Sequence, residues 1–371
     1  MRRITRIFIV VLAFSLLLLL HRPLTPPGLK PRAARRPVTL VFTGDILLAG
    51  RVGEAIQKEG ASTPFEGVQK VLAGADLAIG NLECALGTTG EAADKKYAFR
   101  ARPESAEALR AAGIDAVTLA NNHSVDYGPG ALVETLAALR KHKVAVIGAG
   151  KDSAEARRFL LTTAGSPPMK IAVLAFSNML PTNFYAQRNR AGTNPAWPSR
   201  IEADVAAADR QADLVVVLFH WGDELSPTPS KSQRYLAGVA AEAGADLVVG
   251  HHPHVLQGME QRGHTLIAYS LGNFVFPSRG AAKETAMLRY TIRPDGTALA
   301  EMIPCRIDGF RPRLAAGKDE EQSLLRMRDM SEALGLRMGA EGVVEVARRD
   351  GREAEARRHS PPPVDNPNGQ P

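Results

Sequence analysis

ADLVVGHHPH, residues 245–254, joins a short apolar run to three of the nine histidines in this 371-residue chain. The apolar part is β-branched and has the length of a buried strand. His252 and His254 stand two positions apart, so in an extended or turn conformation both imidazoles point the same way. Imidazole is the commonest protein ligand of transition metals. The stretch therefore predicts a buried strand that ends at a metal site, and the remaining ligands must come from elsewhere in the chain.

The same pattern of an apolar run ending in polar side chains occurs four more times. These runs are PVTLVFTGD (37–45), ADLAIGNLE (75–83), IDAVTLANNH (114–123) and ADLVVVLFHWGDE (212–224). Stretches rich in Ala and Leu with helical spacing lie between them, at 104–112, 129–142, 199–210 and 230–243. Strands that alternate with helices predict an α/β fold with a largely parallel or mixed sheet under helices.

In open α/β sheets, binding sites form outside the carboxyl ends of the strands. The polar residues that end the five runs are therefore expected to converge on one edge. They are Asp45, Glu83, Asn122, His123, His220, His252 and His254. Two carboxylates, an amide and several imidazoles form a mixed oxygen and nitrogen set that suits manganese, zinc or iron. His123, beside the amide pair, is the candidate to protonate a leaving oxygen.

Five motifs in order resemble those of the calcineurin-like metallophosphoesterases: GD at 44–45, GNLE at 80–83, ANNH at 120–123, HWG at 220–222 and GHHPHVLQG at 250–258. More narrowly, GNLE, HWGDE, HHPHVLQ and YSLGNFVF (269–276) resemble the CapA family, which is linked to poly-γ-glutamate capsule synthesis. The resemblance covers about residues 38–305. It implies a four-layer αββα sandwich with mixed sheets and a metal-dependent phosphoesterase site.

The resemblance also implies a role for each strand-end residue, with His123 as the general acid. The residues that would bind one or two divalent transition metal ions are Asp45 and His254 on the first ion, Asn122, His220 and His252 on the second, and Glu83 on both. One position departs from the phosphoesterase pattern, which has Asp-x-His in the first motif. This chain has Leu47 in place of the histidine, so the first ion keeps three protein ligands instead of four.

Two further residues are candidates for substrate binding. Asn273, after the apolar strand HTLIAYS, either reaches the same edge to donate to an anionic substrate or makes a turn with Gly272. Arg100 in YAFRARP (97–103) either binds a carboxylate or phosphate or is a solvated loop charge. Asn121 is either a turn residue or a brace for Asn122. The substrate that these residues would fit is a phosphoester or an anionic envelope polymer.

The N-terminal segment differs in charge from the rest of the chain. Residues 1–36 hold eight of the 46 basic residues and no acid, so 46 − 8 = 38 basic residues face 39 acidic ones in the remainder, a balance of −1. Because the remainder is nearly neutral, the high isoelectric point alone does not support a nucleic-acid partner. Residues 4–20 are almost all apolar, which fits a single-pass membrane anchor or, alternatively, a cleaved secretory signal. Basic residues before that run favour an extracytoplasmic body.

We therefore expect five segments along the chain. They are a signal-anchor or signal peptide over 1–21, a linker rich in Pro and Arg over 22–37, a CapA-like metallophosphoesterase domain over 38–310, a C-terminal helical extension over 311–345 and a disordered tail over 346–371. Residues 285–303 are expected to form a hairpin through Pro294-Asp295-Gly296 that belongs to the second sheet. Whether Cys84 and Cys305 pair is left open by the sequence.

Two functions fit these features. The first is a membrane-anchored enzyme that hydrolyses a phosphoester, or does related chemistry on an envelope polymer, with a bound metal. The second is a metal-containing component of capsule assembly or export that binds an anionic polymer without turnover, together with capsule synthetase or export proteins. His123 favours the first function, and the family's link to capsule synthesis favours the second.

Overall fold

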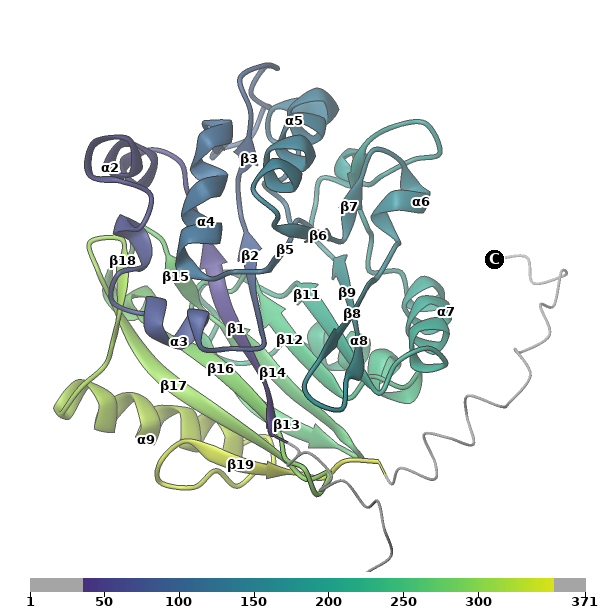
Figure 1. Cartoon of the computed structure of the whole chain (residues 1–371), viewed down its shortest axis with the longest axis vertical. Coiled ribbons are helices and arrows are strands. Elements are labelled where there is room, and N and C mark those ends of the chain that lie inside the picture. The colour runs from purple at the N-terminus through teal and green to yellow at the C-terminus, as the bar shows by residue number, and fades with distance from the viewer. Residues whose placement is uncertain (1–35, 350–371) are drawn as a thin grey trace, which may run out of the picture. The chain divides into compact units, whose positions relative to one another are not determined.

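The computed structural model describes residues 36–349, in which β-strands form two large sheets (Figure 1). The predicted membrane anchor, nearly all of the predicted linker and most of the predicted tail lie outside these residues. Among residues 36–349, no helix combines the length and the apolar character needed to cross a membrane.

The first sheet has nine strands and contains three of the five apolar runs. Its strands, in spatial order, are β18 (Arg311–Leu314), β17 (Ala298–Asp308), β16 (Glu284–Ile292), β1 (Val38–Ile46), β2 (Leu77–Leu82), β5 (Ala116–Thr118) and β6 (Ala145–Ile147), with β15 (Asn273–Val275) paired to β1 and β19 (Val343–Val346) paired to β17. The strands β1, β2, β5 and β6 run parallel, so their carboxyl ends share one edge of the sheet.

The second sheet has six strands and contains the other two runs. Its order is β13 (Leu256–Arg262), β14 (Thr265–Leu271), β12 (Leu247–His251), β11 (Leu214–His220), β9 (Met169–Ser177) and β8 (Leu160–Ala164). Every residue of β11 and β12 is buried. Strands that are covered on both faces need apolar side chains on both, which explains why these runs show no alternation. Two short strand pairs complete the set, β3 (Ala85–Leu86) with β4 (Arg100–Ala101) and β7 (Ala149–Gly150) with β10 (Gly192–Thr193).

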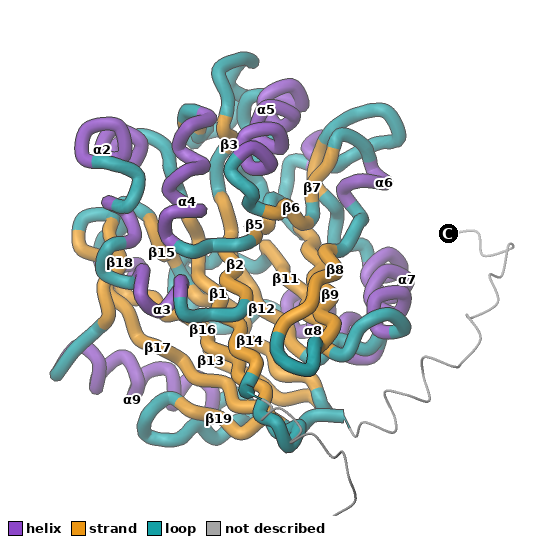
Figure 2. Tube along the Cα trace, in the orientation of Figure 1, coloured by secondary structure: helices purple, strands orange, loops and turns teal. Residues whose placement is uncertain are grey.

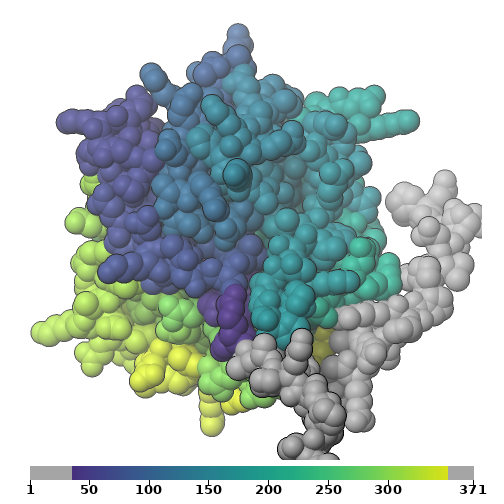
Figure 3. All heavy atoms as spheres, in the orientation of Figure 1, coloured from purple at the N-terminus to yellow at the C-terminus, as the bar shows by residue number. Residues whose placement is uncertain are grey.

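Helices cover the outer face of each sheet, as the ribbon and tube views show (Figures 1 and 2). The helices are α2 (Arg51–Glu59), α3 (Gln69–Ala73), α4 (Ala106–Ala112), α5 (Gly128–Lys141), α6 (Ser153–Ala156), α7 (Pro198–Asp209), α8 (Lys231–Glu242) and α9 (Lys318–Glu332). Four of them match the stretches of helical spacing in the sequence to within two residues at each end. In the space-filling view, atoms of the early segments, coloured purple to blue, occupy the upper left and centre of the face shown (Figure 3).

Three hydrophobic clusters separate four layers of secondary structure. One cluster lies between α2–α5 and the first sheet and includes Val41 and Leu109. A second lies between the two sheets and includes Phe42 and Val216. A third lies between the second sheet and helices α7 and α8, with Val217 and Ile201 among its residues. Successive residues of β1 belong to different clusters, and so do successive residues of β11, since successive side chains of a strand point to opposite faces.

The hairpin predicted over 285–303 is present, but its place in the fold differs from the prediction. Strands β16 and β17 pair antiparallel from Ile292↔Ala298 outward. Strand β16 also pairs with β1, with Val38 opposite Ile292, so the hairpin belongs to the first sheet and not to the second. The turn residues predict a hairpin, but its sheet is set by the long-range pairing with β1, for which the sequence carries no local signal.

The segment predicted as a helical extension contains strands as well as a helix. Helix α9 packs on β13 and β17, while β18 and β19 both pair with β17. The segment is therefore continuous with the first sheet. Cys84 and Cys305 are both buried and unpaired, and burial raises the pKa of each thiol to about 12.

Arg349, at the end of the described chain, forms a buried ion-pair cluster. Its Nη1 lies 2.6 Å from Asp209 Oδ1 and its Nη2 lies 3.0 Å from Asp246 Oδ1, and the Arg349 side chain is only 7% exposed. The guanidinium also donates to the Gly244 carbonyl at 2.6 Å. Removing the cation of a buried ion pair is strongly destabilising, because the remaining carboxylates lose their nearest positive charge. The pairs therefore fasten the C-terminal strand region to α7 and β12.

We expect Arg349→Ala to lower the free energy of unfolding by about 3 kcal/mol, because two buried carboxylates lose their cation. Arg311→Ala is the matched control, since Arg311 pairs with Glu59 at 2.6 Å while both side chains stay 40% or more exposed. That variant should lose less than about 1 kcal/mol. Urea unfolding curves measure both effects, and equal losses in the two variants would contradict a special role for Arg349.

Candidate metal centre

Strand-end side chains from both sheets come together where the carboxyl ends of the parallel strands meet. The residues are Asp45 in β1, Glu83 after β2, Asn122 and His123 after β5, His220 at the end of β11, and His252 and His254 after β12. The Nε2 atom of His251 lies 3.0 Å from the carbonyl of Thr43, which ties β12 to β1 at this point. The predicted convergence is thus present, although the residues come from two sheets and not from one.

Asp45 and His254 form one half of the site. The Nδ1 atom of His254 lies 3.1 Å from Asp45 Oδ2 and 2.8 Å from Asn273 Oδ1. Asn273 stands directly beside Asp45 in the pairing of β15 with β1. Its amide nitrogen donates to Ser278 Oγ at 2.9 Å. Both polar ends of the Asn273 side chain are therefore engaged, and in this arrangement Asn273 orients His254.

Asn122, His220 and His252 form the other half. The Nε2 atom of His220 lies 2.8 Å from Asn122 Oδ1 and 3.1 Å from His252 Nδ1. These three side chains start from three different strand ends. Their close approach leaves two imidazole nitrogens and an amide oxygen facing one another, which is a donor set for a transition metal.

Glu83 lies between the two halves. Its Oε1 is 3.5 Å from His220 Nε2 and 3.9 Å from His254 Nε2. The carboxylate is fully buried, and among the described residues neither of its oxygens has a hydrogen-bond partner. A buried carboxylate without a partner is strongly unfavourable unless something else compensates for it. Ligand atoms of Glu83, His252 and His254 all lie within 4.8 Å of one another, so these residues fit a divalent metal ion.

Protonation of the metal-free site follows from burial and from the charges around it. Burial would raise the pKa of Asp45, but the hydrogen bond and charge of His254 outweigh it and lower that pKa. Burial and the charge of Asp45 hold the pKa of Glu83 well above its ordinary value. Burial opposes protonation of His254, yet the charges of Glu83 and Asp45 raise its pKa to about 10. The metal-free site therefore retains protons where an ion would bind.

The other two imidazoles are held neutral. Burial lowers the pKa of His252 to about 3. Burial, followed by the neighbouring imidazoles, lowers the pKa of His220 well below its usual range. A neutral imidazole is the form that coordinates a metal.

Two asparagines fix the positions of the candidate ligands. The amide nitrogen of Asn81 donates to Asp45 Oδ1 at 2.8 Å and lies 3.3 Å from His220 Nδ1. The amide nitrogen of Asn121 donates to Asn81 Oδ1 at 2.9 Å, and its oxygen accepts from the His123 backbone N–H at 3.0 Å. Asn121 is thus a brace, although it acts on Asn81 and His123. Asn81 was not singled out in the sequence, where its only signal is its place in GNLE.

His123 belongs to a second polar cluster beside the candidate ligands. Its Nδ1 lies 2.7 Å from Asp126 Oδ2, and Lys95 Nζ lies 2.7 Å from Asp126 Oδ1. Lys95 also donates to the Asn122 carbonyl at 2.6 Å. Burial lowers the pKa of His123 against the opposing effect of Asp126. Neither Asp126 nor Lys95 is among the residues expected from the sequence. The spacing His-x-x-Asp is a signal for the first, and no local signal marks the second.

The loop after β12 holds its histidines in unusual backbone conformations. His252 has φ +96° and His254 has φ +60°, in the left-handed region that side chains rarely adopt. Such strain persists only where surrounding contacts impose it, and it is common at functional sites. A Cβ on Gly250 would lie 2.0 Å from the Tyr269 carbonyl oxygen, so this loop begins with a close backbone approach that only glycine permits.

Two residues that the sequence marked lie outside this network. Leu47 packs in the hydrophobic cluster under the helices, and its backbone N–H donates to the Val275 carbonyl at 2.8 Å. Arg100 donates to the carbonyls of Thr89 and Gly90 and stacks 4.0 Å from the Tyr127 ring. The guanidinium of Arg100 is therefore engaged in holding a loop.

Residues 39–278 match the family model described as bacterial capsule synthesis protein PGA_cap. The chain is 33% identical over 274 residues to the PGA biosynthesis protein CapA of Bacillus subtilis, covering 73% of this chain and 72% of that protein. It is 31% identical over 285 residues to the capsule biosynthesis protein CapA of Bacillus anthracis, covering 74% and 69%. A probable polyglutamine synthesis accessory protein of Mycobacterium tuberculosis is 30% identical over 282 residues, covering 71% and 74%.

Two solved structures are more distantly similar. A calcineurin-like phosphoesterase from Bacillus subtilis has 12% sequence identity and a TM-score of 0.39, with 76% of this chain and 89% of that chain covered. A 5′-nucleotidase from Candida albicans has 11% identity and a TM-score of 0.43, with 81% and 59% covered.

We expect Glu83→Gln to stabilise the metal-free protein. Because the folded-state pKa of Glu83 lies above the value of 4.5 for a free glutamate, the unfolded chain ionises first. The free energy of unfolding of the wild type should fall as the pH rises above 4.5, until the pH passes the folded-state pKa. The variant lacks this loss. Each kcal/mol regained should raise Tm by about 2–4 °C.

Thermal melts in a chelator between about pH 5 and pH 8 measure this difference. Glu345→Gln, at an exposed position of β19, is the matched control and should follow the wild type. Identical pH dependence in the wild type and Glu83→Gln would show that folding does not raise the pKa of the Glu83 carboxylate.

Proposed function

We propose that this chain, which belongs to the PGA_cap family of bacterial capsule synthesis proteins, acts in the synthesis or export of a capsule polymer related to poly-γ-glutamate through metal-dependent phosphoesterase chemistry. The names of its relatives support the polymer, and the candidate metal centre supports the chemistry. We assign the four layers of the fold to the metallophosphoesterase type on the ordered motifs of the sequence.

The single observation that carries the chemistry is the fully buried carboxylate of Glu83, which lies between two groups of candidate metal ligands and has no hydrogen-bond partner among the described residues. Asp45 and His254 would hold one ion, and Asn122, His220 and His252 would hold a second. Glu83 would contact both. A bound manganese, zinc or iron ion polarises a phosphoryl oxygen and offsets the negative charge that develops on it.

The chain's own proton donor would be His123. Its Nδ1 lies 2.7 Å from the Asp126 carboxylate and 3.3 Å from Lys95 Nζ, and the closer carboxylate favours the tautomer with the proton on Nδ1 when the ring is neutral. The Nε2 atom is then the position at which a proton is taken up and passed to a leaving oxygen. Lys95 pairs with Asp126 and with the Asn122 carbonyl. Lys95 thereby links the proton donor to a candidate metal ligand and positions both.

A second candidate function is binding of an anionic polymer with metal but without turnover. Leu47 favours it, because its side chain is packed in the hydrophobic cluster and leaves the Asp45 half of the site one ligand short of the phosphoesterase pattern. A weakly held first ion would leave a single ion at the site, which suits binding better than hydrolysis. Metal stoichiometry and hydrolysis, measured on the same preparation, separate the two functions.

We also propose that the described body lies outside the cytoplasmic membrane, held by residues 1–21 as a single-pass anchor. The apolar run and the basic residues before it support this location. Protease treatment of intact spheroplasts should digest the body of an anchored protein. Recovery of the body in the culture medium would instead support a cleaved signal.

We expect the full-length chain, purified and reconstituted with manganese, to bind close to two equivalents of metal and to hydrolyse a generic phosphodiester. His252→Ala and His254→Ala should each lose metal and activity, because each removes a ligand from one half of the site. His142→Ala, a histidine outside the site, is the matched control. Elemental analysis beside the hydrolysis assay measures both. A wild type without metal after reconstitution would contradict the proposal.

His123→Asn should reduce hydrolysis by about 10²–10⁴-fold while metal content stays at the wild-type level, because it removes the proton donor and no ligand. Asp126→Asn should give a smaller loss, since His123 remains but loses the carboxylate that orients it. Wild-type hydrolysis by His123→Asn would exclude this role and leave polymer binding as the better function.

A further inference from the structure

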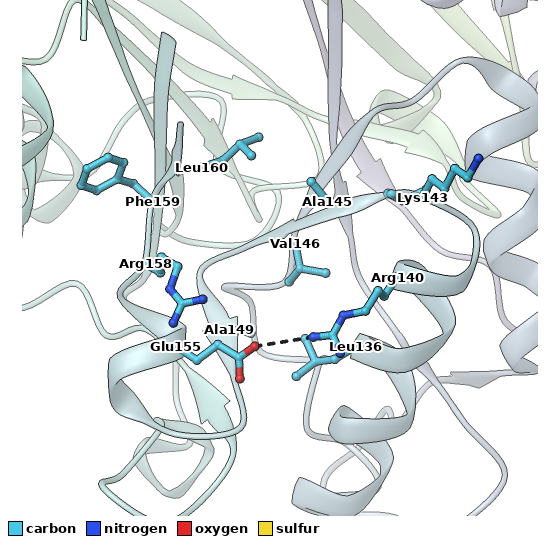
Figure 4. A pocket seen from close by; sticks show the side chains of 11 residues that line it. Leu136, Arg140, Lys143, Ala145, Val146, Ala149, Glu155, Arg158, Phe159 and Leu160 are labelled. Carbon is cyan, nitrogen blue, oxygen red and sulfur yellow. Dashed lines mark ion pairs between the residues drawn. The ribbon is translucent and has the colours of Figure 1, made fainter. Parts of the chain in front are cut away.

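A pocket of about 400 Å³ lies between the free edges of the two sheets, and its lining includes no residue of the candidate metal centre. Strand β6 ends the first sheet and β8 ends the second, and both contribute to the lining. The floor is apolar, with Leu136, Val146 and Leu160 among its side chains. Figure 4 shows Arg158, Glu155 and Arg140 in a row across the pocket, with Val146 above them in the view.

The pocket has an excess of positive charge. Arg140, Lys143 and Arg158 line it against the single carboxylate of Glu155. Arg140 pairs with Glu155 at 3.8 Å. Among the described residues, the side chains of Lys143 and Arg158 have no ion-pair or hydrogen-bond partner. Two cations beside an apolar floor, with nothing in residues 36–349 to neutralise them, favour an anionic ligand that carries more than one charge.

The floor of the pocket also presents unpaired backbone. The backbone N–H of Ala145 donates to the Asp115 carbonyl, and the Ile147 carbonyl accepts from the Leu119 N–H. These two residues of β6 thus turn their hydrogen-bonding groups inward, toward β5. Since the direction alternates along a strand, the N–H and C=O of Val146 point to the free edge. A free strand edge is a template for an extended chain that carries amide groups.

We propose that this pocket binds a segment of a carboxylate-bearing polyamide, so that a polymer of the poly-γ-glutamate type contacts the protein here as well as at the metal centre. Its carboxylates would pair with Arg158 and Lys143, and one of its amides would pair with the backbone of Val146. Its methylene groups would lie on the apolar floor. The choice of polymer rests on the proposed function, whereas the pocket, its charge and its free strand edge do not.

The test is binding of a short, fluorescently labelled poly-γ-glutamate to the full-length chain in the presence of a chelator, followed by fluorescence anisotropy. Arg158→Ala/Lys143→Ala should weaken the Kd by about tenfold, because two charge pairs at the protein surface are lost. Lys58→Ala/Lys70→Ala removes the same charge from helices α2 and α3 and is the matched control. That control should change the Kd by less than about twofold.

Equal weakening by the two double variants would show a general charge effect and overturn the proposal. Glu155→Gln removes the only carboxylate of the pocket and should tighten binding severalfold; unchanged affinity would count against the site, even if the double variant failed to fold. Dextran sulfate of matched charge should bind more weakly than the polyamide, because it offers no amide to Val146. Equal or tighter binding of dextran sulfate would overturn the assignment of a polyamide.

The metal centre and the pocket can fail separately. Arg158→Ala/Lys143→Ala should keep wild-type hydrolysis of a small phosphodiester, because neither residue lies in the candidate metal centre. A protein that hydrolyses the phosphodiester but binds no polymer would retain the proposed chemistry and overturn this inference. A protein that binds the polymer at the pocket but does not hydrolyse the phosphodiester would retain this inference and overturn the proposed chemistry.

Discussion

The fully buried Glu83 carboxylate, which has no hydrogen-bond partner in residues 36–349, dominates the electrostatics of the candidate metal centre. A protein tolerates such a group only where something compensates for the lost hydration. The three histidines around Glu83, the Asn81 amide that orients Asp45, and the strained loop after β12 can all be understood as parts of that compensation. Since metal ligands must be deprotonated to bind an ion, metal binding at this site would depend on pH.

Much of this arrangement follows from local sequence signals. The buried strands are continuous apolar runs, and four helices follow from the spacing of Ala and Leu between them. The ligand set follows from a topological rule, that strand-end residues of parallel strands share an edge. That rule needed no knowledge of how many sheets there are, which is why it places Asp45 and His252 near each other although they belong to different sheets.

Such rules do not predict which distant strands pair, nor which of several possible partners a polar side chain contacts. The hairpin of β16 and β17 has a clear turn, yet only its pairing with β1 places it in the first sheet. Arg100 and Asn273 have residue types that suit an anionic substrate. Arg100 instead donates to two loop carbonyls, and Asn273 contacts His254 and Ser278. Of these partners only Ser278 lies within five residues in the sequence, and the others are brought close by the fold. Asp126 could have been found from its spacing to His123, but Lys95 approaches from a separate loop.

The site draws its candidate ligands from both sheets, and the Asp45 carboxylate and the His252 backbone that meet there are 207 positions apart in the chain. Neither sheet alone carries a complete set. The affinity of the candidate site for an ion therefore depends on the relative position of the two sheets, which the hydrophobic layer between them maintains. A methyl group lost from that layer, far from any ligand, would separate the ligands within each half of the site, since each half takes residues from both sheets. Such a substitution would loosen the candidate metal centre while leaving the protein folded.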